Sequence, residues 1–198
     1  MLDGERAHYS NNTIDIVYDY PFGKSELYGL AYRTDFDLKN HFKEPPYEDV
    51  ETGEKFYPHV IEPTFGVDRS VLAVLLDAYT EEKDPSIPLG ASRIVLKLKP
   101  SLAPYKVAVF PLLKNKPELV EKAKEVYSIL KKEYNVAFDD RGNIGKRYYS
   151  QDEIGTPFCV TIDFDTLESD TVTVRNRDTM KQERVEVKSL TNYLDVLL

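Results

Sequence analysis

The sequence has 198 residues, enough for one large domain or two small ones, and its 41% hydrophobic content is enough for a real core. A net charge of −8 argues against a protein that wraps nucleic acid with a basic surface. We expect no membrane span and no secretory signal, because no apolar run reaches roughly 18 residues and the N-terminus is polar. Cys159 is the single cysteine, so we expect a reducing, cytoplasmic setting without disulfides.

The charge is divided unevenly along the chain. Residues 1–103 carry a net charge of −7, whereas residues 104–198 carry a net charge of −1. Residues 80–93 combine charges, two prolines and a glycine, a composition typical of a boundary. We predict a first region over 1–83, a linker over 84–103 and a second domain over 104–198.

In the first region, apolar periodicity predicts strands followed by one helix. Alternation predicts strands within 12–23, 25–34 and 59–65, while 44–58 is a loop or hairpin. Apolar positions then recur at helical spacing from Val71 to Tyr79. Three strands and one helix leave the sheet edges and the apolar face of the helix without cover. We therefore expect this region to need further structure that packs against it.

In the second domain, strands and helices alternate. Its helix over 116–134 has one apolar stripe, formed by Leu119, Ala123, Val126 and Leu130. The other predicted elements are strands at 105–113, 135–140, 157–164, 171–179 and 183–187, and helices at 144–155 and 188–198. This order predicts a mixed sheet covered by helices, which makes the chain α/β, or α+β as a whole.

Charged residues crowd the end of the second predicted strand. Glu26, Arg33, Asp35 and Asp37 lie in or beside it. Arg33, Asp35 and Asp37 have the same parity and would line one sheet face if the strand continued that far. A solvated strand face with local ion pairs is the alternative.

A second polar group lies where the third strand passes into the helix. Glu62 and Thr64 offer a carboxylate and a hydroxyl, and Gly66 permits close approach to the backbone. Arg69, at the helix start, suits a phosphate because its planar fork donates two parallel hydrogen bonds. The alternative is a packing turn with Asp68 or Thr64 as the helix cap.

Several long stretches resemble one enzyme family in the same order. "EPTFGVDR" resembles motif 3 of class II aminoacyl-tRNA synthetases, and "ELYGLAYRTDFDL" resembles the preceding strand in glycyl-tRNA synthetases of the archaeal and eukaryotic type. "YKVAVFPLLKN" and the stretch from "FDDRGNIGKRYYSQDEIG" to "RDTMKQERV" resemble their anticodon-binding domain. The resemblance implies a partial antiparallel catalytic sheet with the motif 3 helix, followed by a mixed-sheet anticodon-binding domain.

The resemblance also implies roles for the polar residues of the first region. Arg69 would contact the γ-phosphate of ATP, Gly66 would lie near ATP, and Glu26 would hold ATP and its Mg²⁺. Arg33 would face the carboxylate of glycine, while Glu62 and Thr64 would bind its ammonium group. Thr64 stands where the family usually has serine, so the hydroxyl is kept and a methyl is added. No protein nucleophile is needed, because the glycine carboxylate attacks the α-phosphate in line.

Motifs 1 and 2 of the family are not found in the sequence. The resemblance therefore implies a partner polypeptide that carries them, a dimer about motif 1, and no activity of this chain alone. In the second domain it implies binding of tRNA(Gly), with Tyr148 and Tyr149 as aromatic platforms. The expected anticodon readers are Arg147, Gln151, Asp152, Glu153, Arg175 and Arg177. The alternatives are a non-catalytic tRNA-binding accessory protein of the same fold and an independent ATP-binding enzyme, although no second phosphate-binding element is found in the sequence for the latter.

Overall fold

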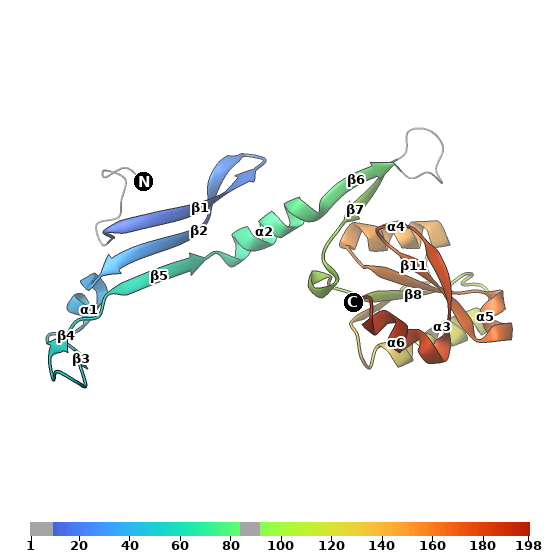
Figure 1. The fold of residues 1–198 in the computed structure, drawn as a ribbon. Helices are drawn as coiled ribbons and strands as arrows, with labels where there is room; N and C mark the ends of the chain where they lie inside the picture. The colour runs from blue at the N-terminus through green and yellow to red at the C-terminus, as the bar shows by residue number, and fades with distance from the viewer. Residues whose placement is uncertain (1–9, 84–91) are drawn as a thin grey trace. The chain divides into compact units, whose positions relative to one another are not determined.

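The computed structural model describes residues 10–83 and 92–198, and the chain divides into two compact units between Leu76 and Asp77. Each unit has its own sheet (Figure 1). In the part of the chain that is described, no helix has the length and apolar character needed to cross a membrane.

The first unit is an antiparallel sheet of three strands in the order β1-β2-β5, with β2 in the centre. Its elements are β1 (Asn12–Tyr20), β2 (Gly23–Thr34), α1 (Phe36–His41), β3 (Tyr47–Glu48), β4 (Lys55–Phe56), β5 (Val60–Phe65) and the start of α2 (Val67–Ala78). The strands and the long helix were predicted, and β3 pairs with β4 as a hairpin. Helix α1 was not predicted, because its six residues are too few to show a periodic pattern.

The first unit buries little of its apolar surface. Among its described residues, the buried hydrophobic side chains are Tyr20 and Ala73. Ile14, Phe65 and Val67 are 56%, 67% and 75% exposed. Burial of apolar surface is the main term that stabilises a fold. Contacts within the first unit therefore contribute little to the stability of this sheet.

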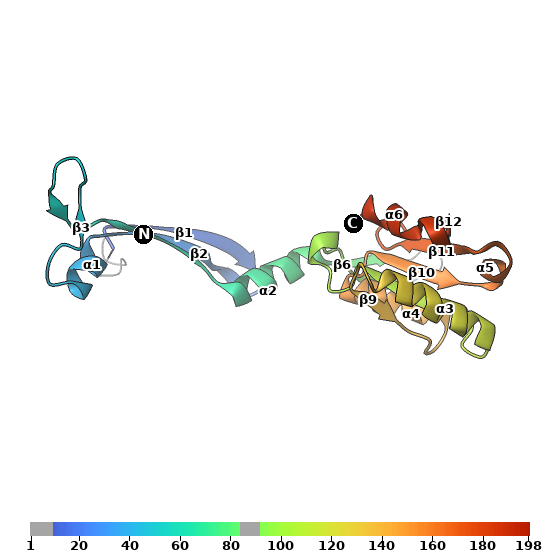
Figure 2. The ribbon, with the colours of Figure 1, turned by 90° about the horizontal axis from the view of Figure 1, so that it is seen from below.

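The second unit is built on a mixed sheet of five strands in the order β12-β11-β10-β8-β9. Strand β10 is parallel to β8, which is parallel to β9, while β11 and β12 run antiparallel. Its elements are β8 (Val107–Pro111), α3 (Pro117–Leu130), β9 (Val136–Phe138), α4 (Ile144–Ile154), β10 (Phe158–Ile162), α5 (Phe164–Ser169), β11 (Thr171–Asn176), β12 (Gln182–Glu186) and α6 (Leu190–Asp195). Helices α3 and α6 cover one face, and α4 lies on the other (Figure 1 and Figure 2).

This unit has the core that the first unit lacks. The predicted apolar stripe of α3 is fully buried, from Leu119 to Leu130, against the alternate residues of β8 and β10. On the opposite face, α4 packs Ile144 and Tyr148 over Ala108, Phe110 and Cys159. The predicted mixed sheet covered by helices is therefore confirmed.

A hairpin precedes this domain in the second unit. Strand β6 (Tyr79–Lys83) pairs antiparallel with β7 (Ser92–Leu96). The expected linker over 84–103 begins with residues 84–91, which lie outside the described residues, and continues into β7 and a short 3-10 helix, Pro100–Leu102. The segment after β7 packs closely on the end of α4, since a Cβ on Gly155 would lie 2.8 Å from Leu98 Cδ1.

Candidate functional site

Cross-strand pairing divides the sheet of the first unit into an apolar face and a polar face. Ile14 lies opposite Leu30, and Leu30 lies opposite Pro63, so these side chains share one face. On the other face, Gly29 pairs with Thr64 and Ala31 pairs with Glu62. Small residues of the central strand thus lie beside the two predicted glycine-binding residues of β5.

A β-bulge brings Glu26 onto this polar face. Ile16 pairs with Tyr28 while Val17 pairs with Glu26, which leaves Leu27 as an extra residue in β2. One extra residue reverses the face of the positions on one side of it relative to those on the other, so Glu26 lies on the opposite face from the one that regular alternation from Tyr28 would give. The carboxylate oxygen Oε1 of Glu26 accordingly lies over Gly29, 3.1 Å from where a Cβ would be.

A second irregularity directs Arg33 toward Glu62. Tyr32 pairs with Ile61 and Thr34 with Val60, so Arg33 has no partner position on β5, and Thr34 adopts a φ of 53°. This left-handed conformation is rare for a β-branched residue and turns the chain out of the strand. The Arg33 guanidinium then lies 2.9 Å from the carboxylate of Glu62.

Arg33, Asp35 and Asp37 would share one extended face only if the strand continued to Asp37, and it does not, because β2 ends at Thr34 and α1 begins at Phe36. The helical turn instead brings Asp37 to Arg33 in a bidentate ion pair, with both distances 2.6 Å. These hydrogen bonds raise the pKa of Arg33 and lower the pKa of Asp37. Asp35 pairs with Lys39 at 2.6 Å.

Arg69 reaches the end of β2 that carries Glu26. It lies in the first turn of α2, and its guanidinium donates hydrogen bonds to the backbone carbonyl of Glu26 and, at 3.5 Å, to Ser25 Oγ. Gly66, just before α2, lies beside Arg69, since a Cβ there would be 3.6 Å from Arg69 Cβ. Along the polar face, Arg69 and Glu26 are therefore at one end, Arg33 and Glu62 at the other, and Thr64 between them.

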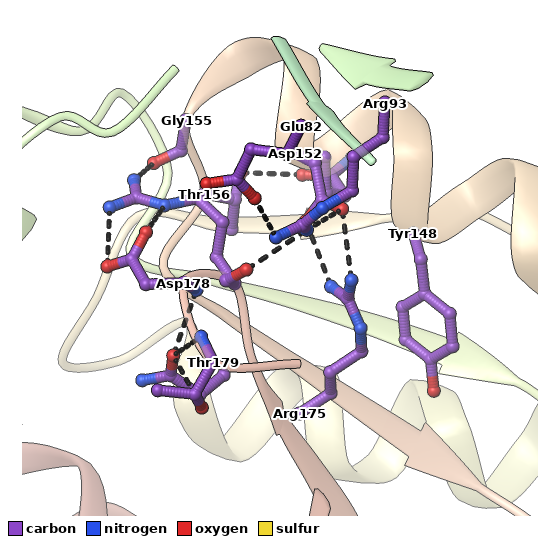
Figure 3. Close-up of polar contacts among 12 residues, drawn as sticks. Glu82, Arg93, Tyr148, Asp152, Gly155, Thr156, Arg175, Asp178 and Thr179 are labelled. Carbon is purple, nitrogen blue, oxygen red and sulfur yellow. Dashed lines mark hydrogen bonds and ion pairs between the residues drawn. The ribbon is translucent and has the colours of Figure 1, made fainter. Parts of the chain in front are cut away.

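The second unit contains a buried network of arginines and carboxylates (Figure 3). Asp152, fully buried on α4, accepts hydrogen bonds from Arg93 at 2.8 Å and from Arg175 at 2.9 and 3.0 Å. Arg93, which comes from β7, also donates to Glu82 of β6 at 2.6 Å. The carboxylate of Asp152 thus pairs with two guanidinium groups, and the carboxylate of Glu82 balances the charge of Arg93.

Most of the predicted anticodon readers face the interior of this unit. Arg147, Gln151, Asp152, Arg175 and Arg177 are all at most 6% exposed, whereas Glu153 is exposed. Arg147 donates to backbone carbonyls such as that of Gly142 at 3.0 Å, and Gln151 accepts from Thr156 at 2.7 Å. Arg177 donates to the carbonyls of Gly155 and Leu98 at 2.7 and 2.9 Å. Base reading by these five stays a prediction, and it would require them to leave these partners.

Tyr148 links the buried network to the surface. The Arg175 guanidinium lies 4.8 Å from its ring centroid, and its hydroxyl is 2.7 Å from Thr161 Oγ1. Burial raises the pKa of this hydroxyl. The Tyr148 ring lines a cleft that also includes Thr173 and Gln182. Thr173 and Gln182 were not predicted from the sequence; the alternation of "TVTVRN" was a signal for Thr173 only.

No group of three or more histidine, cysteine, aspartate or glutamate side chains that could hold a metal ion occurs within residues 10–83 and 92–198. A protein-held metal centre thus has no support in this part of the chain.

The second unit matches a known family. Residues 106–197 match the family model described as "Anticodon binding domain". The mixed sheet of β8 to β12 with α3, α4 and α6 is therefore the fold of an anticodon-binding domain.

The whole chain is similar to glycine–tRNA ligases. It is 52% identical over 194 residues to the glycine–tRNA ligase of Clostridium tetani, covering 96% of the chain and 41% of that protein. The chain corresponds to the C-terminal part of glycine–tRNA ligases at about 50% identity. It is also 50% identical to the ligases of Clostridium beijerinckii and Caldanaerobacter subterraneus subsp. tengcongensis, over 98% and 96% of the chain and 42% and 41% of those proteins. The chain spans about two fifths of these relatives and matches their C-terminal part.

Proposed function

We propose that the chain contributes one wall of a glycine and ATP site, together with tRNA(Gly) anticodon binding, to the ATP-dependent attachment of glycine to tRNA in the cytoplasm. The observation that carries this proposal is the shared polar face of β2 and β5, where Glu26, Arg33, Glu62 and Thr64 lie together with Arg69 at its end. In this proposal, residues 1–83 are part of the catalytic domain, residues 84–103 are a linker, and residues 104–198 are the anticodon-binding domain.

The glycine end of the site is formed by Glu62, Thr64 and Arg33. Arg33 is shared by two carboxylates, Glu62 and Asp37, so the cluster carries an excess of negative charge that favours an ammonium group. Gly29 and Ala31 lie directly opposite Thr64 and Glu62. Because their side chains are small, the space above them is where a small ligand could lie beside Thr64 and Glu62. A pocket of this kind selects glycine by excluding a Cβ, and Arg33 gains the glycine carboxylate as a further partner.

The ATP end of the site is formed by Arg69, Gly66 and Glu26. The Glu26 carboxylate is exposed and forms no hydrogen bond or ion pair with the described residues, so it is available to a cation-bearing ligand. Arg69 holds two acceptors of β2 and retains further N–H donors for phosphate oxygens. These residues fit an ATP molecule that carries Mg²⁺, and Glu26 would contact that ion. That ion supplies charge neutralisation at the phosphates when it is bound.

In the reaction, a glycine carboxylate oxygen bonds to the α-phosphorus of ATP, and the bond between the α- and β-phosphates breaks to release pyrophosphate. Glu62 and Thr64 orient the ammonium group so that the carboxylate points at the phosphate. Arg69 stabilises the charge that develops on the leaving phosphates.

The apolar face of the same sheet supports a protein partner. Ile14, Ile16, Ile61 and Phe65 are each more than half exposed, and so are Val67 and Val71 of α2. Monomeric proteins rarely leave so much contiguous apolar surface in water. We propose that a polypeptide with motifs 1 and 2 covers this face, that the assembled enzyme is dimeric about motif 1, and that the chain alone is inactive.

Glycine-dependent exchange of pyrophosphate into ATP tests the proposal. We expect no exchange from the chain alone and recovery after addition of a folded polypeptide carrying motifs 1 and 2. In the recovered enzyme, Arg69→Ala should abolish exchange, whereas Lys24→Ala, another exposed cation of β2, should leave it unchanged. tRNA binding should persist in both variants.

Two results would contradict this account. Exchange by the isolated chain would show that its site is complete. Absence of recovery with a matching, folded partner, combined with intact tRNA binding, would favour the alternative of a non-catalytic tRNA-binding accessory protein.

A further inference from the structure

Asp37 holds one edge of the Arg33 guanidinium. Its two carboxylate oxygens accept hydrogen bonds from Nε and Nη2 of Arg33, each at 2.6 Å, while Nη1 donates to Oε2 of Glu62 at 2.9 Å. A guanidinium is planar, so two parallel hydrogen bonds along one edge fix both its plane and its direction. The pairing with Asp37 therefore decides that Nη1 points to Glu62.

The turn after β2 brings Asp37 to this place. Thr34 has a φ of 53°, and Asp35 has a φ of −92° and a ψ of 7°, so the chain leaves the extended conformation there. Asp37 thus enters the first turn of α1 four residues after Arg33. Asp35 and Lys39 form a second ion pair of the same spacing, at 2.6 Å. Of these two pairs, only that of Asp37 leads back to the sheet.

Glu62 lies on the open side of this cluster. The side chains of Arg33 and Asp37 are 16% and 23% exposed, whereas that of Glu62 is 46% exposed. Oε2 of Glu62 accepts from Arg33, and its Oε1 accepts no hydrogen bond from the described residues. Arg33 thus holds the Glu62 carboxylate by one oxygen, and the other oxygen can accept from the ammonium group of a ligand.

Loss of the Asp37 carboxylate would change how Arg33 meets Glu62. An arginine side chain has much rotamer freedom, and it keeps one direction only where its head group is held. Without Asp37, the guanidinium would be able to turn away from Glu62 or to bind both of its carboxylate oxygens. Either change removes the arrangement in which one oxygen is anchored and the other is left for an ammonium group.

We propose that Asp37 is a positioning residue for glycine: it holds Arg33 so that Arg33 orients the Glu62 carboxylate, and it does not touch glycine itself. The inference rests on the proposed function, because it names a further residue of the same glycine site. The ATP end should not depend on Asp37, since Arg69 is held by acceptors at the other end of β2.

The test uses the recovered enzyme, in which the complete chain is joined by the polypeptide with motifs 1 and 2. Apparent KM values for glycine and for ATP, and kcat, are measured by pyrophosphate exchange. We expect Asp37→Asn to raise the KM for glycine about tenfold and to leave the KM for ATP within about twofold of the original. A role in folding alone would lower the amount of active enzyme, and therefore kcat, without separating the two KM values.

Two variants separate positioning from charge. Asp35→Asn removes the same charge from the same turn, but its partner is Lys39 on α1, so the KM for glycine should stay at the original value. Asp37→Glu keeps the charge and both acceptor oxygens, and should recover most of the affinity that Asp37→Asn loses. Helix α1 contains no buried residue, so these variants should keep the fold, which thermal unfolding checks.

A double variant shows whether Asp37 acts through Arg33. Arg33→Lys replaces the planar fork by a single ammonium group, which cannot be held along an edge, and should raise the KM for glycine by itself. Adding Asp37→Asn to Arg33→Lys should then change this KM by less than about twofold, because the group that Asp37 orients is already gone.

The outcomes separate the two levels of inference. If the recovered enzyme is active and Asp37→Asn leaves the KM for glycine unchanged, raises both KM values equally, or adds its full effect to that of Arg33→Lys, Asp37 does not position Arg33, and the glycine site still stands. If the original chain with its folded partner shows no exchange, the proposed function fails, and the role of Asp37 fails with it.

Discussion

Strands β8 and β10 of the second unit are buried at every position, whereas β5 of the first unit is exposed at all positions except Val60. The residue types are similar, since both sheets use valine, isoleucine and phenylalanine. The difference is cover: α3, α4 and α6 pack on the second sheet, while both faces of the first remain accessible within its unit. Composition therefore does not tell where a core forms, because burial depends on what packs against each face.

The charged side chains of the two units also differ in how far they are buried. In the first unit, Glu26, Glu62 and Arg69 are exposed, so they can change partners when a ligand binds. In the second unit, Asp152 and Arg175 are buried and paired, so they hold a fixed geometry.

The largest expected difference between the units is in hydrogen exchange of the complete chain. Amides of β8, β10 and α3 should exchange only through global opening, which costs roughly 5–15 kcal/mol in a domain of this kind. Amides of β1, β2 and β5 should exchange at much lower opening free energies, because little apolar surface is buried there. Mass spectrometry of peptides from each strand measures this, and equal protection of both sheets would contradict the comparison.

A smaller effect is expected from breaking the buried network. Asp152→Ala leaves the guanidinium groups of Arg93 and Arg175 without their carboxylate, and should lower the free energy of unfolding by about 3–5 kcal/mol. Glu186→Ala is the control, because Glu186 and its partner Lys188 are both exposed; its cost should stay within about 1 kcal/mol. Urea unfolding followed by circular dichroism measures both. A small loss for Asp152→Ala would mean that the network is not a structural anchor.

The smallest effect concerns acid stability of the second unit. Burial by itself would raise the pKa of Asp163, but hydrogen bonds from Arg184 and Thr166 lower it in the folded state. A lowered pKa stabilises the fold above about pH 4, the ordinary value, and this contribution is lost as the pH falls through the folded pKa.

Asp163→Asn keeps a residue that can cap α5 but removes the charge, so it should destabilise the fold by about 1 kcal/mol at pH 7 and by less near pH 3. Asp165→Asn, whose side chain is 80% exposed in the same turn, should show no such pH dependence. Urea unfolding at both pH values tests this. A constant difference between Asp163→Asn and the original chain would contradict the assignment.

Much of the fold follows from local patterns. The stripe of α3 from Leu119 to Leu130 and the alternation of β1 are readable in the sequence, because each side chain is placed by the period of its own element. Short elements without a full period, α1 and α5, were not predicted. Nor was the pairing of β6 with β7, since residues 80–93 look like a charged boundary.

Local patterns in the sequence indicated the strands of both sheets, the long helices and the charged residues at the end of β2 and the start of α2. How those residues are presented depends on contacts that form only in the folded chain. The extra residue Leu27 turns Glu26 onto the face of Thr64, and the turn at Thr34 directs Arg33 to Glu62. Asp152 holds the guanidinium of Arg175 in the interior of the second unit. Register and burial arise from contacts between segments far apart in the chain, so no local pattern of residues encodes them.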